Sequence, residues 1–161
     1  MIYTNEKMAQ LLNTTSFDRI AEQEFDSISN IISPIFVDVD DCVLLKNKNE
    51  DIKPLDMNMI CKFYGDRTGF EAFYNHIHTS QYIDDDNKGP IEGFKLAKYI
   101  LDAWKTKLKI EFPENKFHLI LSYDGKESTL RFHKYRQDEG SYLVIDDLDG
   151  YKGEAILVEE I

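Results

Sequence analysis

The clearest alternation of apolar and polar positions lies in residues 117–136, FHLILSYDGKESTLRFHKYR. Every second residue from Phe117 to Leu121 is apolar, and the same rhythm resumes at Leu130 and Phe132 after an Asp-Gly tip. Period two on both arms, with Asp-Gly between them, is typical of a β-hairpin. We therefore expect this hairpin to form the centre of the fold.

Two further apolar runs follow the hairpin at short spacing. They are residues 142–145, YLVI, and residues 155–158, AILV. Each run has the length of a short strand, and short connections favour antiparallel neighbours. The last third of the chain is therefore predicted to be an antiparallel meander.

Helical spacing dominates the N-terminal part of the chain. Weak periodicity predicts a short helix within residues 1–14, and apolar residues recur every three or four positions over residues 17–32. Thr15 and Asp18 have the spacing of a capping box, and Pro34 is expected to end this second helix. The pattern predicts two consecutive helices here.

The middle of the chain mixes both patterns. Residues 35–45 are rich in β-branched side chains and predict one strand, or two strands with a break at Asp40-Asp41. Residues 55–63 suit a helix or a buried strand, and residues 70–77 have helical spacing. Tyr82-Ile83 is interpreted as a short edge strand.

A long helix is predicted after this mixed region. Residues 84–89, DDDNKG, are typical of a turn or exposed loop. Pro90 suits the first turn of a helix, and one apolar stripe then runs from Phe94 to Leu108. This stripe is long enough to cover one face of a sheet.

These elements favour the α+β class. Helices come early and in the middle, whereas the clearest strands gather at the end, so we expect several helices packed on an antiparallel sheet built around the hairpin 117–136 and the C-terminal strands. The length of 161 residues and the absence of a long linker predict a single domain, residues 1–161.

Composition narrows the kind of partner. The 19 basic and 30 acidic residues give a net charge of −11. Such a surface repels phosphate backbones, so no nucleic acid is expected to bind and a basic partner fits better, although acidity also serves solubility. We expect no membrane segment and no signal peptide, and Cys42 and Cys61 are interpreted as reduced, mostly buried thiols of a cytoplasmic protein.

One stretch raises an enzymatic alternative. Residues 36–44, FVDVDDCVL, resemble the first motif of haloacid-dehalogenase-like phosphohydrolases, in which one aspartate attacks phosphorus, the next transfers protons and Mg²⁺ offsets the charge. That family needs helical crossovers between parallel strands, and the residues from Ser122 to Lys134 can form only a hairpin. A magnesium-dependent phosphohydrolase therefore stays the alternative.

The histidines give no clear metal or catalytic site. His76 and His78 fall on a predicted helix, where residues two apart point to different faces. His118 and His133 are expected to be cross-strand neighbours in the hairpin, and a structural pair is favoured over an acid-base pair. We predict no cofactor, no metal and no catalytic residue.

A family resemblance comes from the C-terminal part. The segments that carry it are residues 96–112, 121–124, 130–136 (LRFHKYR), 146–151 (DDLDGY) and 154–159 (EAILVE). Together they resemble immunity proteins of bacterial contact-dependent growth inhibition systems. The resemblance implies a cytoplasmic protein that binds the toxin domain of a delivered effector and blocks it without catalysis.

The charge pattern then suggests where such a toxin would bind. Many of these toxins are nucleases with basic grooves, which an acidic inhibitor can fill by mimicking phosphate charge. Three acidic groups lie in or beside predicted turns, where side chains are free to meet a partner, although they can equally cap turns or keep the protein soluble. The groups are Asp146, Asp147 and Asp149, which we place first, then Asp84, Asp85 and Asp86, and Asp38, Asp40 and Asp41.

Overall fold

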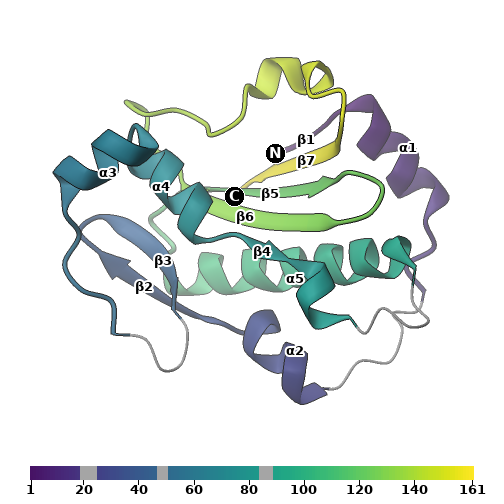
Figure 1. Cartoon of the computed structure of the whole chain (residues 1–161), viewed down its shortest axis with the longest axis horizontal. Coiled ribbons are helices and arrows are strands. Elements are labelled where there is room, and N and C mark those ends of the chain that lie inside the picture. The colour runs from purple at the N-terminus through teal and green to yellow at the C-terminus, as the bar shows by residue number, and fades with distance from the viewer. Residues whose placement is uncertain (19–24, 47–50, 84–88) are drawn as a thin grey trace.

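The protein is built on a five-stranded antiparallel sheet with the predicted hairpin at its centre (Figure 1). The computed structural model describes residues 1–18, 25–46, 51–83 and 89–161. The strand order across the sheet is β1 (Ile2–Thr4), β7 (Ala155–Glu160), β5 (Phe117–Tyr123), β6 (Ser128–Lys134) and β4 (Ile77–His78). The fold is therefore α+β, as the sequence predicts.

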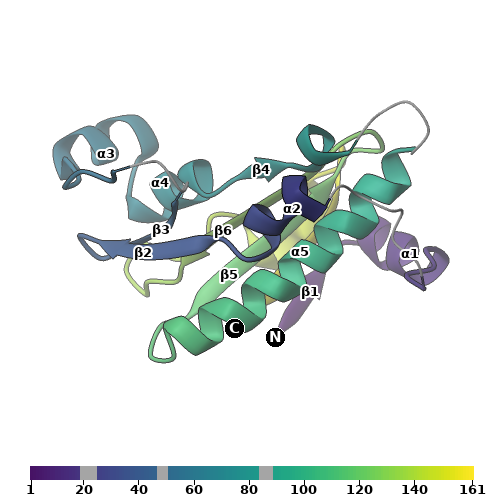
Figure 2. The same cartoon turned by 90° about the horizontal axis from the view of Figure 1, so that it is seen from below.

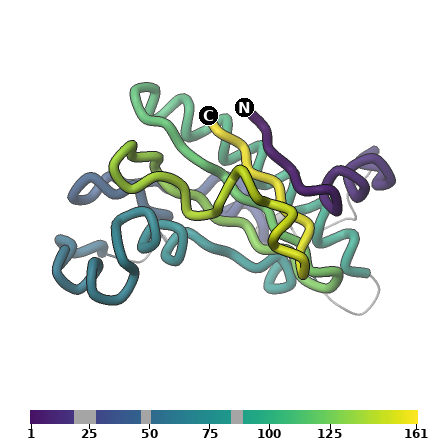
Figure 3. The backbone as a smooth tube through the Cα atoms, turned by 90° about the horizontal axis from the view of Figure 1, so that it is seen from above, coloured from purple at the N-terminus to yellow at the C-terminus, as the bar shows by residue number. Residues whose placement is uncertain are grey.

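The predicted meander is wrong in one respect. Residues 142–145 form no strand but lead into a 3₁₀ helix, η2 (Ile145–Gly150), and β7 pairs with β5 rather than following β6. The outer edge of β6 is already taken by β4. The chain therefore crosses over the sheet before returning on the far side of β5, as Figure 3 shows.

Both faces of the central hairpin are buried, each against a different cover. Phe117, Leu119 and Leu121 join the main core, whereas Ile120 packs with Leu148 of η2 in a separate cluster. Helix α5 (Pro90–Glu111) crosses the first face, as seen in Figure 2, and the segment 141–154 covers the second. The period-two prediction is therefore confirmed for this strand.

The predicted long helix is α5, and it places its apolar stripe on the sheet. Phe94, Ala97, Leu101, Trp104 and Leu108 are all essentially buried. The Trp104 indole N–H donates to the backbone carbonyl of Ile31 at 2.6 Å, in the last turn of α2 (Phe25–Ile32). A buried indole donor is thereby satisfied, and α2 is fixed across α5.

The N-terminal part differs from its prediction. The first residues form β1 before α1 (Glu6–Thr14) begins, and Thr15 ends α1 instead of starting a second helix. Buried Asn5 explains the change of direction, because its side-chain oxygen accepts from the backbone N–H groups of Met8 and Ile156 at 3.0 and 2.9 Å. The start predicted for the second helix falls partly on residues 19–24, outside the described residues.

A second, two-stranded sheet shows that residues 35–45 form two strands with a break at Asp40-Asp41, the second of the two alternatives that the sequence left open. Strands β2 (Ile35–Val39) and β3 (Cys42–Lys46) pair around these two residues, whose φ angles are 52° and 67°. Positive φ at both positions matches the right-handed twist of a hairpin with a two-residue loop. The helices α3 (Met57–Tyr64) and α4 (Arg67–Tyr74) follow.

Two smaller predictions in this region are wrong. The edge strand is Ile77–His78 rather than Tyr82-Ile83, and residues Thr79–Tyr82 form a 3₁₀ turn, η1. Both cysteines are free, but only Cys42 is buried, because Cys61 faces outward on α3. Among the helices that the structure describes, none combines the length and apolar character needed to cross a bilayer.

Candidate functional site

The Asp40-Asp41 turn is held by side chains from distant parts of the chain. The Asp41 carboxylate binds Arg67 Nη1 at 2.8 Å, Lys134 Nζ at 2.5 Å and Arg136 Nε at 3.3 Å. The hydrogen bond from Lys134 lowers the pKa of Asp41. Asp40 accepts from the backbone N–H of Leu55 at 2.7 Å. Two of the three aspartates predicted here to meet a partner therefore stabilise the turn itself.

Beneath this turn lies a buried ion pair between Glu71 and Arg136. Glu71 is fully buried, and Arg136 donates to its two oxygens at 2.9 and 3.1 Å. Burial raises the pKa of Glu71, but the guanidinium and two backbone N–H donors favour its charged form. Burial would lower the pKa of Arg136, yet hydrogen bonds to Glu71 raise it on balance. The pair is therefore held by two direct hydrogen bonds in a site that water does not reach.

Glu71 also joins the two sheets. Its carboxylate accepts from the backbone N–H of Val43 at 2.6 Å and from that of Lys134 at 2.9 Å. One turn later, at the C-cap of α4, Asn75 donates to the carbonyls of Val43 and Phe132 at 2.8 and 3.2 Å. These two side chains, one in α4 and one at its end, thus replace the backbone bonds that β3 and β6 do not make to each other.

This arrangement bears on the phosphohydrolase alternative. Asp38 lies exposed on β2 of an antiparallel hairpin, and Asp41 is occupied by three cationic side chains. Nucleophilic aspartates of that family need a parallel strand followed by a helical crossover. Burial also raises the pKa of the adjacent Cys42 thiol to about 12, which makes it a poor nucleophile. The local geometry gives the alternative no support.

The acidic group formed by Asp146, Asp147 and Asp149 differs from the group at the β2–β3 turn. Asp146 and Asp147 are exposed on η2, and within the described residues their carboxylates form no hydrogen bond or salt bridge. Asp149 is exposed too, but it accepts from the backbone N–H of Glu6 at 2.8 Å and so fixes the start of α1. The third group, Asp84, Asp85 and Asp86, lies outside the described residues.

The segment before η2 presents apolar side chains beside these acids. Tyr142 and Val144 are exposed, whereas the alternate residues Leu143 and Ile145 pack against the cluster that contains Ile120 and Leu148. The backbone N–H of Tyr142 donates to His133 Nε2 at 3.3 Å, and that of Val144 to the Tyr151 hydroxyl at 3.1 Å. We call residues 142–147 the acidic loop; its backbone is braced although it is neither strand nor α-helix.

The histidine predictions have mixed outcomes. His118 and His133 are cross-strand neighbours as expected, with ring centroids 5.1 Å apart, and both are buried. Burial lowers the pKa of His133 to about 4 and also lowers that of His118. His76 directly precedes β4 and His78 is its last residue, so neither lies on a helix, and their rings are 5.2 Å apart. Among the residues described, no group of three metal-ligating side chains comes together.

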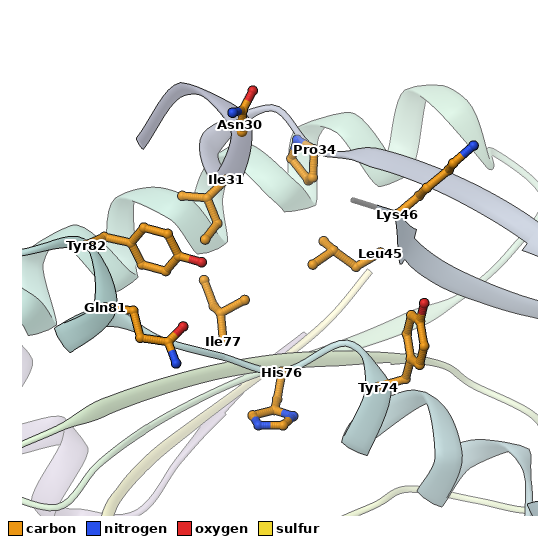
Figure 4. A pocket seen from close by; sticks show the side chains of 10 residues that line it. All are labelled: Asn30, Ile31, Pro34, Leu45, Lys46, Tyr74, His76, Ile77, Gln81 and Tyr82. Atoms are coloured by element: carbon orange, nitrogen blue, oxygen red, sulfur yellow. The ribbon is translucent and has the colours of Figure 1, made fainter. Parts of the chain in front are cut away.

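A pocket of about 520 Å³ opens between α2, β3, β4 and η1 (Figure 4). Ile31, Leu45 and Ile77 point toward one another inside it, with the Tyr82 hydroxyl directed into the same space. Lys46 and His76 are at its edge and point away from its centre. The side chains directed inward are thus largely aliphatic and bring no pair of charged groups together for acid-base chemistry.

The fold and the acidic loop define an α+β protein whose exposed features suit protein binding. The chain belongs to the Uncharacterized protein PM0498 family, whose model matches residues 3–161. It is 27% identical over 169 residues to Uncharacterized protein PM0498 of Pasteurella multocida (strain Pm70), with 100% of this chain and 99% of the relative covered. No solved structure matches the chain.

Proposed function

We propose that the protein is a cytoplasmic immunity protein, which binds the toxin domain of a contact-dependent growth inhibition effector and blocks it without catalysis. The observation that carries the proposal is the acidic loop. Within the described residues the carboxylates of exposed Asp146 and Asp147 form no hydrogen bond or ion pair, and exposed Tyr142 and Val144 lie beside them in the sequence. Aromatic and apolar groups next to unpaired charges are the features from which protein interfaces are built.

Charge then selects the kind of toxin. The net charge of −11 favours a basic partner, and a nuclease with a cationic substrate groove is the class that fits. Carboxylates that enter such a groove replace substrate phosphates and pair with the lysines or arginines that bind them. Tyr142 would contribute apolar area at the centre of the contact, which charge alone does not supply.

The test needs a candidate toxin, and we would take the C-terminal domain of a large secreted protein encoded directly upstream. Co-expression should restore growth of cells that make this domain. The double variant Asp146→Asn with Asp147→Ser should bind it at least about tenfold more weakly at low salt, because a buried interfacial charge is worth about 2 to 5 kcal/mol. Binding would be measured by calorimetry at low and high salt.

Asp102→Asn is the matched control. Asp102 is an exposed acid on α5, on the other face of the sheet, where it pairs with Lys98 at 2.7 Å. This variant removes one negative charge, whereas the double variant removes two, and it should keep the parent affinity. Equal binding by all three proteins at both salt concentrations would refute the acidic loop as the contact, and failure of the parent to protect cells would refute the immunity function.

A further inference from the structure

The chain that follows α4 buries every second side chain. Asn75, Ile77 and Thr79 are buried, whereas His76 and His78 between them are partly exposed. Residues two apart in a strand share a face, and the two imidazole rings accordingly lie side by side, with centroids 5.2 Å apart. The helix expected from the sequence would have turned them to different faces.

Buried neighbours fix the backbone that carries these histidines. The Asn75 side chain donates to one carbonyl in β3 and one in β6, and its oxygen accepts from the backbone N–H of Leu45 at 2.8 Å. Ile77 joins the main core and pairs with Leu130 of β6 in the sheet. One histidine lies between these two anchors and the other directly follows them. The pair is therefore presented by backbone that the core holds in place.

Each imidazole has one nitrogen engaged and the other available. His76 Nδ1 donates to the backbone carbonyl of Phe73, and because a carbonyl can only accept, Nε2 keeps its lone pair. His78 Nδ1 is hydrogen-bonded to the Thr129 hydroxyl at 3.1 Å, which can accept from Nδ1–H in the same way. Within the described residues neither Nε2 has a hydrogen-bond partner. Metal-ligating histidines are usually oriented like this, through the nitrogen that does not bind the metal.

The spacing of the two rings suits a shared metal ion. At Zn–N distances of about 2.0 to 2.1 Å and a tetrahedral angle, two imidazoles on one ion have centroids roughly 5 Å apart. The observed separation of 5.2 Å agrees with this value. The rings are therefore already as far apart as those of a chelating pair.

The other two of the four histidines show that spacing alone makes no site. The rings of His118 and His133 are 5.1 Å apart, but both are buried. His133 uses both of its nitrogens, Nδ1 with the Lys134 carbonyl at 3.1 Å and Nε2 with the Tyr142 N–H at 3.3 Å. A metal ion needs both a free nitrogen and access from the solvent, which this buried pair does not offer.

The charged side chains described around the exposed pair are engaged elsewhere. Glu127 accepts from the backbone N–H of Ser80 at 3.1 Å, and the Arg131 guanidinium lies 5.4 Å from the centroid of the Tyr142 ring. Lys46, at the edge of the same pocket as His76, points away from it (Figure 4). Binding would therefore rest on coordination by neutral imidazole, a ligand that suits copper, nickel and zinc ions.

We infer that His76 and His78 form a two-histidine site for a divalent transition-metal ion, with Cu²⁺ bound more tightly than Ni²⁺ or Zn²⁺. Both imidazoles bind the ion through Nε2. Within the described residues no third metal-ligating side chain joins the pair, so water fills the remaining positions. The inference goes beyond the proposed function, because neither the acidic loop nor a toxin takes part.

The probes are the metal ions alone, added to protein that carries no histidine tag. Isothermal titration calorimetry should show one equivalent of Cu²⁺ bound, with Ni²⁺ and Zn²⁺ weaker at the same site. Electron paramagnetic resonance of the Cu²⁺ complex should show coupling to two imidazole nitrogens. Excess Mg²⁺ should not displace Cu²⁺, because Mg²⁺ prefers oxygen ligands.

Variants then separate the histidine pair from the carboxylates of an acidic surface. His76→Gln and His78→Gln should each weaken Cu²⁺ and Ni²⁺ binding at least about tenfold, because the second imidazole binds intramolecularly. His133→Gln is the matched control, since it removes a histidine whose nitrogens are already occupied. It should stay within about twofold of the parent, as a distant and independent change does. Circular dichroism would check that all three variants fold.

Each other outcome overturns the inference. If the parent protein binds neither Cu²⁺ nor Ni²⁺, the pair is not a metal site. If either exposed-histidine variant binds like the parent, or Mg²⁺ displaces Cu²⁺, the ion is held by other groups. If His133→Gln loses binding, the buried pair is the ligand. None of these results would bear on growth protection by the acidic loop.

Discussion

Two aspartate-rich segments of this protein look alike in the sequence and differ in the structure. Asp41, in the β2–β3 turn, is surrounded by Arg67, Lys134 and Arg136. Asp146 and Asp147 on η2 have no such partner within the part of the chain that the structure describes. The first segment uses its charge to hold the fold, and the second leaves its charge to the solvent or to another protein.

The difference comes from sequence separation. Lys134 and Arg136 are 93 and 95 residues away from Asp41, so local composition does not reveal them. Around η2 the chain is acidic over a long stretch, with one lysine against eight acids from Asp138 to the end. Clusters of acidic residues become candidate interfaces only after the cations that the fold brings to them are known.

The largest expected effect is loss of the buried anion beneath the turn. Glu71→Ala should lower the free energy of unfolding by about 3 to 5 kcal/mol, because buried Arg136 would lose its fully buried partner and keep only longer ion pairs with Asp41 and Glu139. The backbone N–H groups of Val43 and Lys134 would also lose their acceptor. Urea unfolding measures the change.

A companion variant separates the contribution of the Glu71 charge from that of its size and hydrogen bonds. Glu71→Gln keeps the size of the side chain but removes its charge, so it should still cost most of this amount if the ion pair dominates. A change below about 1 kcal/mol for both variants would show that water or another group satisfies Arg136. The charges around the β2–β3 turn would then contribute as little to stability as those on η2.

The next prediction is that the free energy of unfolding depends on pH through His133, which accepts a hydrogen bond from the acidic loop. The folded pKa of His133 is about 4, whereas an exposed histidine titrates near about 6.5. The unfolded chain therefore binds more protons between these values, so this stability is fully present above about pH 6.5 and is lost as pH falls toward 4. The loss should approach roughly 3 kcal/mol.

The surroundings of His133 give this prediction its control. His118, Arg136 and Glu139 act on its charge, and its Nε2 accepts from Tyr142 N–H only when the ring is neutral. Burial lowers the pKa of His118 in the same direction. His133→Gln keeps an acceptor for Tyr142 and should flatten the slope of stability against pH; an unchanged slope would assign it to other groups.

The smallest effect compares the two segments directly. Asp41→Asn should destabilise the protein by about 1 kcal/mol, since its ion pairs are half exposed and screened by water. Asp146→Asn should change stability by less than about 0.5 kcal/mol, as surface substitutions away from contacts do. Thermal unfolding of the two variants side by side tests the contrast, and equal destabilisation would contradict it.

Local patterns predicted several elements correctly. The alternation around Asp124-Gly125 located the central hairpin, and Pro90 with the stripe through Trp104 located α5. The Asp40-Asp41 break was one of two alternatives for residues 35–45, because turn residues inside an apolar run favour a hairpin without excluding one continuous strand. In each of these cases the signal lies within a few residues of the element.

The elements that were predicted wrongly or missed depend on contacts with residues far away in the sequence. Strand β1 has three residues and exists because β7 pairs with it, which no local period predicts. Residues 142–145 keep the period of a strand, but they cover the sheet because β4 already occupies the edge of β6. The groove that Leu44, Ile60 and Phe63 line beside α3 was not predicted either, since it depends on which side of α3 packs on Leu44.

The ion-pair network has one more consequence, which concerns the energetic cost of association. Arg67 binds both Asp41 and Glu139, so the β2–β3 turn, the start of α4 and the segment leading to the acidic loop are fixed to one another. A partner that contacts both sides of this network would meet surfaces whose relative position is already set. Little conformational entropy would then be lost on binding, and such preorganisation favours slow dissociation.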